Sequence, residues 1–463
     1  MKKLFTKNNI LYALSIVLLF LIAYILQLKL VIPSLLLCLS LYVRFRALHI
    51  KNYNLLNLSL LFVIIFVLSY FIIKQGLSEY TIPFIIIPML ATILFGNLEI
   101  SLLLTLAASI SVASIAGNYL YLSVLFLVSG LLSSILVFDV RRRMAIIQAG
   151  FLVGLVQALL LFFIGPLWTG ETQRYWLFIV NGIVSSIIVL GILPVFEYLF
   201  KTVTNISLLE LADFNHPLLQ RMVLEAPGTY HHSLIVGNLS DAACTAVGAN
   251  SLLARIGAYY HDIGKLVKPE YFSENQTLDE NKHDLLAPSM SKLVIMNHVK
   301  EGVELANKHH FNSRLIDFIL QHHGDSLVFY FYRRALENLE EDHEVKEEGF
   351  RYAGPKPDSK ETAIVLLADS VEAASRALQD SSPKKVEEVV HKIINNKFID
   401  GQLDQCDLTL KDLEKISAVF IHILSGIYHS RINYPESIGS ENNHKKSAED
   451  NSRQSRKDKK SSS

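Results

Sequence analysis

The sequence predicts an all-α protein in two parts, a polytopic helical membrane region followed by an all-α soluble domain. The chain has 463 residues, of which 51% are hydrophobic, and a mean hydropathy of +0.34. Its longest apolar runs gather before residue 200. Beyond that point apolar residues recur at intervals of three and four, and no stretch shows the sustained alternation of a half-buried strand. Bilayer-spanning helices are therefore expected in the first part and amphipathic helices in the second.

Eight apolar runs are candidate membrane spans, since a helix needs about 20 apolar residues to cross the hydrocarbon core. The second and fourth runs are the weakest, because they are short or are interrupted by Pro33, Pro83 and Pro88. The sequence therefore predicts seven or eight spans. The candidates are residues 9–28, 30–45, 54–74, 80–97, 99–117, 119–139, 145–166 and 175–199.

The basic residues between these runs predict their orientation. Lysines and arginines gather before the first run, after the second and after the sixth, whereas the alternate loops carry only Lys29, Lys74 and Arg174. By the positive-inside rule, the N-terminus, the Arg141–Arg143 loop and everything after Leu199 face the cytoplasm, and an even number of spans fits best. The first run lacks a small-residue cleavage site, so we expect it to be a span and not a cleaved signal.

Composition divides the chain into three parts. Residues 1–200 form the predicted membrane region, and residues 201–435 form one soluble domain long enough for a sizeable core. Residues 436–463 are polar, charged and without aromatics, so they are expected to be disordered. The basic residues of this tail could touch anionic lipid, although a solvated tail is the simpler interpretation. The segment 339–360, rich in Glu, Lys and Pro, is expected to form a surface loop or flap.

Charge and cysteine content argue against two kinds of function. The chain has 43 Lys and Arg against 43 Asp and Glu, and its soluble part has no basic stripe with interleaved aromatics. No nucleic-acid polymer is therefore expected as a partner. The cysteines, Cys38, Cys244 and Cys406, are scattered and odd in number, so they form neither a disulfide framework nor a cysteine-based metal site.

The soluble part carries histidines and aspartates suited to a metal centre. Imidazole and carboxylate bind divalent metals such as Fe, Mn and Zn. An aspartate beside a histidine can bridge two metals while the histidine binds one of them, which is typical of a binuclear hydrolase that cuts a phosphoester. The candidates are the His261-Asp262 pair, His231-His232, His298, His322-His323 and Asp369.

Two further positions support a site of this kind. Lys265 follows His261 by four residues and shares a helix face with it if that helix continues so far. An ammonium group there could neutralise a phosphate oxygen. Asp369 lies in an apolar helical run, where a carboxylate is costly unless it is paired or binds a metal.

The alternative interpretation is that these residues are hydrogen-bonded core residues, as most lone buried histidines and aspartates are. His309-His310 shows that this chain carries a histidine doublet with no need to bind a metal. His283 and His343 lie among charged residues and are expected to be solvated. A motif match alone carries a risk of a false assignment.

Three motifs resemble the HD superfamily of metal-dependent phosphohydrolases. They are Pro-Gly-Thr-Tyr-His-His-Ser at 227–233, Tyr-His-Asp-Ile-Gly-Lys-Leu at 260–266 and Gln-His-His-Gly-Asp at 321–325. Within that superfamily they are similar to the membrane-anchored phosphodiesterases with a seven-transmembrane region, the PgpH-like hydrolases of cyclic di-AMP. The match covers almost all of the soluble domain and, more loosely, the membrane region, including the run from Gly130 through Arg143 to Gly165.

This resemblance implies a ligand set and a reaction. It places one divalent metal, Mn or Fe, on each of two overlapping sets of side chains, with Asp262 as the bridge and Lys265 offsetting negative charge on the phosphate. A hydroxide between the metals would hydrolyse cyclic di-AMP to pApA. The HD domain would lie in the cytoplasm, and the membrane region would lie in a lipid bilayer. The first set is His232 (not His231), His261, Asp262 and Asp369; the second is Asp262, His298, His322 and His323.

Two departures from the family and two alternatives complete the expectations. The large extracellular domain common in such relatives is absent from the predicted loops, and no Gly-Tyr-Pro follows His322-His323, which counts against cyclic di-GMP.

The aromatic run Phe329–Tyr332 could stack on adenine, fill the core or contact a second copy, so a homodimer is left open. The alternative functions are hydrolysis of another nucleotide, such as a dNTP or (p)ppGpp, and nucleotide sensing without turnover. The complete ligand set counts against sensing.

Overall fold

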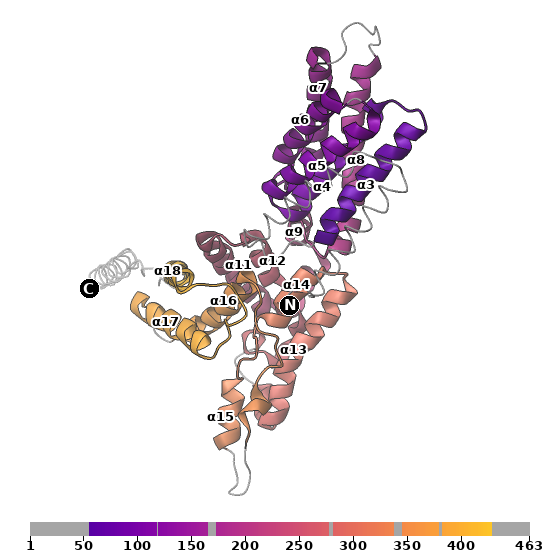
Figure 1. The fold of residues 1–463 in the computed structure, drawn as a ribbon. Coiled ribbons are helices and arrows are strands. Elements are labelled where there is room, and N and C mark those ends of the chain that lie inside the picture. Colours follow the sequence, from indigo (N-terminus) through magenta and orange to yellow (C-terminus); the bar gives the residue numbers. More distant parts are fainter. Residues whose placement is uncertain are drawn as a thin grey trace, which may run out of the picture.

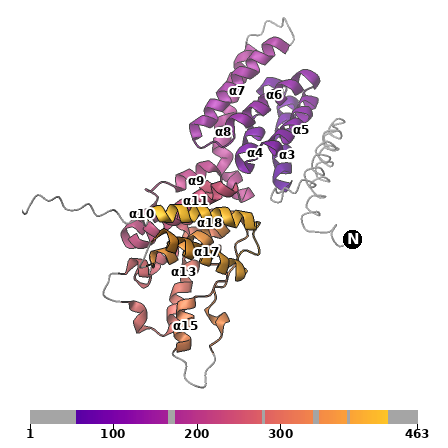
Figure 2. The ribbon, with the colours of Figure 1, turned by 90° about the vertical axis from the view of Figure 1, so that its left-hand side faces the viewer.

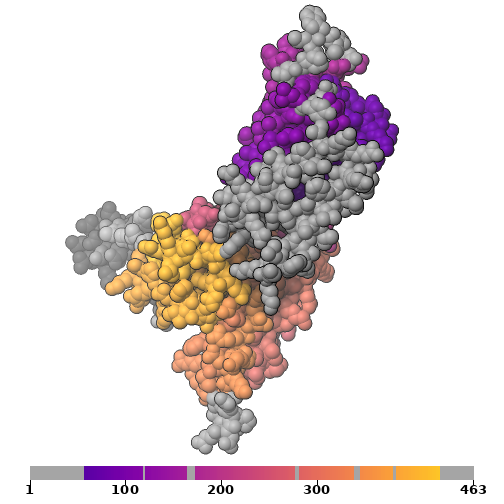
Figure 3. Space-filling model, in the orientation of Figure 1, coloured from indigo at the N-terminus to yellow at the C-terminus, as the bar shows by residue number. Residues whose placement is uncertain are grey.

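The computed structural model describes residues 55–427, except for 118, 165–172, 277–280, 338–344 and 379–381. The described residues form helices joined by turns, and the β pairing among them is an isolated bridge between Leu327 and Arg351. The all-α prediction is therefore confirmed. The apolar helices form one bundle and the remaining helices pack at one end of it (Figures 1 and 2). The same division is visible on the molecular surface in Figure 3.

The bundle contains helices long and apolar enough to cross a membrane. Among the described residues there are five, and they correspond to the third and the fifth to eighth predicted spans. The close approach of the last two depends on glycine, since a Cβ on Gly182 would lie 2.2 Å from the carbonyl oxygen of Gly150. The helices are α3 (Leu55–Lys74), α5 (Leu98–Ala116), α6 (Tyr119–Val137), α7 (Arg143–Ile164) and α8 (Gln173–Phe200).

The fourth apolar run, which the sequence marks as weak because Pro83 and Pro88 interrupt it, does not form one long helix. A 3-10 turn, Glu79–Thr81, is followed by the ten-residue helix α4 (Ile86–Phe95), with Pro83 between them. Proline removes a backbone donor and disfavours helix in the residue before it, so the run is divided. Gly96 then ends α4 in the left-handed conformation, with φ of 59°. The first two predicted spans and the 436–463 tail lie outside the described residues.

The soluble part is an all-α domain built around a buried central helix. This helix, α16 (Lys360–Arg376), starts at a capping box formed by Ser359 and Thr362, and its residues 363–369 are all buried. The other helices are α9 (Asn205–Leu211), α10 (Pro217–Glu225), α11 (Pro227–Val247), α12 (Ser251–Tyr260), α13 (Pro288–Lys308), α14 (Ser313–Gln321), α15 (Phe329–Glu337), α17 (Pro383–Ile399) and α18 (Leu410–Ile427). Proline occupies the first helical position of α10, α11, α13 and α17, where its missing donor costs nothing.

Polar contacts join the soluble domain to the end of the bundle where α6 leads into α7. The guanidinium of Arg143 lies 2.6 Å from Glu210 on α9, and the Asn205 amide donates to Asp139 at 2.7 Å. The Arg141–Arg143 turn and the soluble domain therefore lie at the same end of the bundle, as the charge pattern predicts.

Candidate metal centre

Five helices converge on one buried cluster. His232 projects from α11, His298 from α13 and Asp369 from α16. The other four members directly follow the last residues of α12 and α14: His261-Asp262 and His322-His323. All seven side chains predicted as metal ligands are thus brought together.

The chain turns sharply after α12. A 3-10 helix, Ile263–Val267, replaces the continued α-helix considered in the sequence, so Lys265 does not share a helical face with His261. A Cβ on Gly264 would lie 1.8 Å from the carbonyl oxygen of His298, so only glycine allows this turn to lie against α13. The turn therefore brings Asp262 and His298 into one site.

Asp262 lies between two groups of ligand atoms. Its Oδ2 atom is 3.2 Å from Nε2 of His261 and 3.7 Å from Nε2 of His232. The other carboxylate oxygen, Oδ1, is 3.4 Å from Nε2 of His298 and 3.5 Å from Nε2 of His322. Each oxygen of this one carboxylate therefore faces a different pair of histidines.

Asp369 and His323 complete the two groups. Oδ1 of Asp369 lies 3.0 Å from Nε2 of His232, and its Oδ2 lies 3.6 Å from Nδ1 of His323. Within each group all ligand atoms are within 4.8 Å of one another. The groups are His232, His261, Asp262, Asp369 and Asp262, His298, His322, His323.

Backbone carbonyls orient three of the histidine rings. Nδ1 of His261 contacts the Ala258 carbonyl at 2.7 Å, and Nδ1 of His322 contacts the Ile319 carbonyl at 2.9 Å. His298 makes the same contact with the carbonyl three residues before it. When Nδ1 donates to a carbonyl, Nε2 is the free ligand atom, and in each ring Nε2 faces Asp262.

Burial and charge move the pKa values of the cluster in opposite directions. Burial opposes the charge on His261, but the Asp262 carboxylate outweighs it and raises its pKa to about 10. Burial lowers the pKa of His298 to about 4, against the attraction of Asp262. Burial would raise the pKa of Asp262, but His261 and Lys265 hold it well below its usual range. Asp262 is therefore ionised and His298 is a neutral potential ligand.

Two buried atoms of the cluster fit a metal better than a hydrogen-bonded core. Nε2 of His261 and Oδ1 of Asp262 are inaccessible to solvent and have no hydrogen-bond partner. Leaving such atoms unpaired is costly, so their presence together favours an inorganic ligand. A cation would satisfy both and would displace the proton from His261.

Lys265 contacts the cluster through Asp262. Its Nζ atom is 2.8 Å from Oδ2 of Asp262 and 2.7 Å from Oε1 of Glu274. Burial disfavours its charge, but these two carboxylates raise its pKa. The ammonium group is thus held by two ion pairs.

Three neighbours of the cluster were not among the residues predicted from the sequence. Glu372 contacts Nδ1 of His232 and accepts from Arg376 at 2.7 Å. Glu274 pairs with Lys265, and the Tyr352 ring stacks on His323 with centroids 4.3 Å apart. Tyr352 comes from the segment expected to be a loop or flap, so the described part of that segment lines the site. The three-residue spacing of Glu372 from Asp369 is the one signal that could have pointed to Glu372.

Other sequence candidates lie away from the cluster. His231 is exposed, and Phe329 and Tyr330 are 64% and 61% exposed, which leaves them free of the core. The expectation that His283 is solvated is wrong, because it is buried and its Nε2 contacts the Tyr271 carbonyl at 2.7 Å. His343 lies outside the described residues.

The all-α fold and a carboxylate shared by two groups of histidines are typical of a phosphohydrolase domain lined by histidine and aspartate. Comparisons with known proteins agree with this class. Residues 229–374 match the HD domain, and residues 24–204 match the family described as 7TM receptor with intracellular HD hydrolase. The chain belongs to this family of membrane proteins that join a 7TM region to an HD domain.

Relatives similar over most of this chain are cyclic-di-AMP phosphodiesterases named PgpH. The one from Bacillus subtilis is 39% identical over 405 residues, which are 84% of this chain and 56% of that protein. The one from Listeria monocytogenes is 38% identical over 391 residues, 82% of this chain and 53% of that protein. The chain thus spans about half the length of these relatives. A crystal structure of the L. monocytogenes PgpH HD domain in complex with cyclic-di-AMP is 46% identical, with a TM-score of 0.45, covering 47% of this chain and 100% of that one.

Proposed function

We propose that this protein is a membrane-bound phosphodiesterase that hydrolyses cyclic di-AMP to pApA at a binuclear metal centre. The observation that carries the proposal is the position of Asp262, whose two oxygens face His261 and His298 on opposite sides at 3.2 Å and 3.4 Å. A carboxylate so placed can bridge two cations. The substrate is taken from the PgpH relatives, which are 39% and 38% identical to this chain over 405 and 391 aligned residues.

The proposed ligands follow the two groups of atoms. One divalent cation would be held by His232, His261, Asp262 and Asp369, and the second by Asp262, His298, His322 and His323. Mn and Fe both suit such a set of imidazoles and carboxylates. When bound, the pair would lower the pKa of a water molecule and orient it for attack on phosphorus.

The protein's own groups prepare the site for this reaction. Asp262 and Asp369 are ionised, so they supply the negative charge that two cations require. Lys265 is the proposed catalytic cation, and its ion pairs with Asp262 and Glu274 hold it where negative charge develops on the phosphate. Tyr352 forms a flat surface beside His323, on which a base of the substrate can stack.

Turnover by the full chain in detergent tests the proposal. Cyclic di-AMP and cyclic di-GMP are supplied separately with Mn²⁺ or Fe²⁺, for the wild type and for Asp262→Ala. We expect pApA from cyclic di-AMP and none from the variant. If the protein binds two metals but cleaves neither dinucleotide, the proposed function is wrong, and the protein either hydrolyses another nucleotide or senses one without turnover. Assays with a panel of dNTPs and (p)ppGpp would distinguish these two alternatives.

We propose further that the HD domain faces the cytoplasm and that residues 1–200, 201–435 and 436–463 are the three parts of the chain. The Arg141–Arg143 turn lies beside α9, so basic loop and soluble domain share one side of the membrane. A cysteine introduced at exposed Lys300 should resist a membrane-impermeant thiol reagent in intact cells and react after lysis. Reaction in intact cells would show that the HD domain lies on the opposite side of the membrane.

Light scattering of the purified full chain tests whether the protein forms a homodimer.

A further inference from the structure

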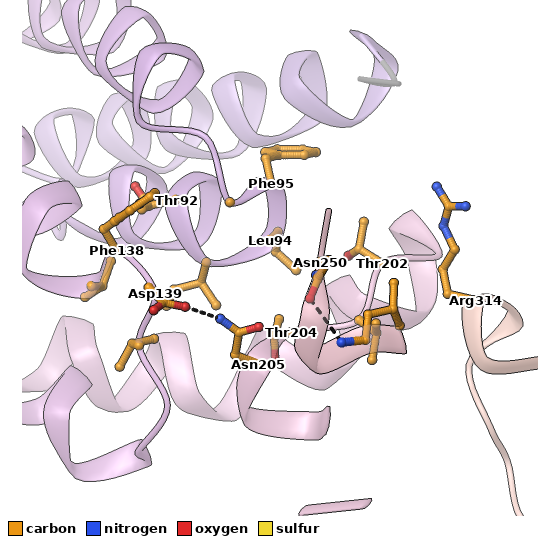
Figure 4. Close-up of a pocket in the computed structure, with 16 residues that line it drawn as sticks. Thr92, Leu94, Phe95, Phe138, Asp139, Thr202, Thr204, Asn205, Asn250 and Arg314 are labelled. Atoms are coloured by element: carbon orange, nitrogen blue, oxygen red, sulfur yellow. Dashed lines mark hydrogen bonds between the residues drawn. The ribbon is translucent and has the colours of Figure 1, made fainter. Parts of the chain in front are cut away.

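A cavity separates the membrane helices from the soluble domain. It has a volume of about 410 Å3 and is lined by the ends of α4 and α6, by the connection from α8 to α9, and by the starts of α12 and α14 (Figure 4). Phe95, Val137 and Phe200 end three of the bundle's helices on this side. The cavity therefore lies where the apolar surface of the bundle stops.

The two sides of this junction cavity differ in chemistry. The bundle contributes apolar side chains, including Leu94, Phe95 and Phe138. The connection and the soluble domain contribute mostly polar ones, among them Thr202 and Arg314. A ligand with an apolar part and a hydrogen-bonding, charged head would suit this division.

The charged groups of the cavity favour an anionic head. Asp139 is engaged by the Asn205 amide at 2.7 Å and by Arg141 at 3.4 Å. Arg314 is exposed, and in the described part of the chain it has no carboxylate within 4.0 Å; Asp317, one turn further along α14, feels its charge. The guanidinium is therefore available to a phosphate at the edge of the cavity.

The cavity is also connected to the metal centre through two helices. Asn250 and Leu253, at the start of α12, line the cavity, and His261-Asp262 follow the end of that helix. Arg314, in the first turn of α14, lines it too, and His322-His323 follow the end of α14. An occupant would touch the near ends of both helices whose far ends carry the cluster.

We propose that the junction cavity binds an anionic phospholipid, with its phosphate at Arg314 and its glycerol and upper acyl chains against Leu94 and Phe95. A free phosphate would leave the apolar wall uncovered, whereas a lipid at the edge of the bilayer covers both sides. The bound lipid links membrane composition to the positions of α12 and α14.

Lipid binding to the full chain tests the site without any turnover, so failure of the proposed hydrolysis would not affect the result. Phosphatidylglycerol and phosphatidylcholine are added to delipidated protein, and bound lipid is counted by native mass spectrometry. We expect phosphatidylglycerol to bind in preference, and Arg314→Gln to weaken it about tenfold, as for the loss of one charge-assisted hydrogen bond. The matched control is Arg333→Gln, another exposed arginine, which is on α15 and pairs with Glu337.

Three results would overturn the proposal. The first is equal binding by the wild type and Arg314→Gln, and the second is displacement of the lipid by millimolar inorganic phosphate, which would identify free phosphate as the ligand. The third comes from Leu94→Trp, which places a large ring in the cavity and should exclude the lipid; full binding by this variant would put the lipid elsewhere. Equal cyclic di-AMP turnover in phosphatidylglycerol and phosphatidylcholine nanodiscs would remove the link to the metal centre.

Discussion

The Nδ1 atom of His232 faces a carboxylate oxygen of Glu372, 140 residues further along the chain. On the other side of the same ring, Nε2 faces Asp369 at 3.0 Å. A carboxylate behind a ligating histidine fixes the ring's orientation and increases its basicity. Glu372 is therefore a positioning residue for the first group of ligands.

Replacing Glu372 by Gln should weaken metal binding about 10- to 100-fold, because the amide keeps the shape of the side chain but not its charge. Metal titration of the chelator-treated full chain measures this change. Glu388→Gln on α17 is the matched control, since Glu388 forms an exposed ion pair with Lys385. An unchanged affinity in Glu372→Gln would show that the His232 orientation is set by α11 alone.

Asp262→Asn should remove both metals, because each oxygen of this carboxylate serves one group of histidines. Loss of the centre removes several kcal/mol of transition-state stabilisation, so turnover should fall at least about 1000-fold. Metal analysis and turnover are measured on the same sample, with Asp404→Asn, an exposed aspartate, as the control. A variant that keeps one metal would show that Asp262 does not bridge.

The carboxylates around His261 set the sign of one pH dependence. In the metal-free fold its pKa is raised from 6.5 to about 10, because the attraction of Asp262 outweighs the cost of burial. The folded protein then holds a proton that the unfolded chain has lost. This stabilisation is complete below about pH 6.5 and is lost as pH rises through about 10. Metal binding requires that proton to leave, so metal affinity should rise over the same range.

Calorimetry of the chelator-treated protein between pH 6.5 and 10 checks this expectation. The Tm should fall with pH, and His261→Gln should flatten the fall. His422→Gln, at an exposed position on α18, is the control and should keep the wild-type slope. A Tm that rises with pH in the wild type would contradict the direction of the His261 shift.

The candidate residues of the cluster could be found in the sequence because their chemistry is visible in residue types, whereas the choice of His232 over His231 and the division into two groups came from the resemblance to the HD superfamily. His261-Asp262 and His322-His323 are adjacent pairs, and Asp369 is a carboxylate in an apolar run. Amphipathic spacing also predicts the helices that carry them. Their convergence in space is then a consequence of burying the apolar faces of α12, α14 and α16 against one another.

The partners of the ligands could not be predicted in the same way. Glu274 lies in a 3-10 turn among polar residues, and Tyr352 in a segment without periodicity, so nothing local marks either side chain. Their roles depend on long-range contacts with Lys265 and His323. The division of the fourth apolar run, by contrast, has a local signal, since its hydropathy resembles a span while Pro83 prevents a continuous helix.

The two ion pairs of Lys265 lead to opposite expectations for the metal affinity of Glu274→Gln and of Lys265→Met. Glu274 shares the ammonium with Asp262, since Nζ of Lys265 lies 2.7 Å from Glu274 and 2.8 Å from Asp262. In Glu274→Gln the ammonium should pair with Asp262 alone, compete with the cations and lower metal affinity about tenfold. In Lys265→Met that competition is absent, so metal affinity should rise, while turnover at saturating metal should fall about 100-fold because the charge on the phosphate is no longer offset.

Metal titration and turnover at saturating metal, measured on both variants, separate these effects. Glu270→Gln is the matched control, because Glu270 is a neighbouring, half-exposed glutamate paired with Lys282 at 3.6 Å. If Lys265→Met turns over as fast as the wild type once both metals are bound, Lys265 only balances the charge of Asp262 and Glu274. If metal affinity and turnover change in opposite directions, the same ammonium both restrains metal binding and assists the reaction.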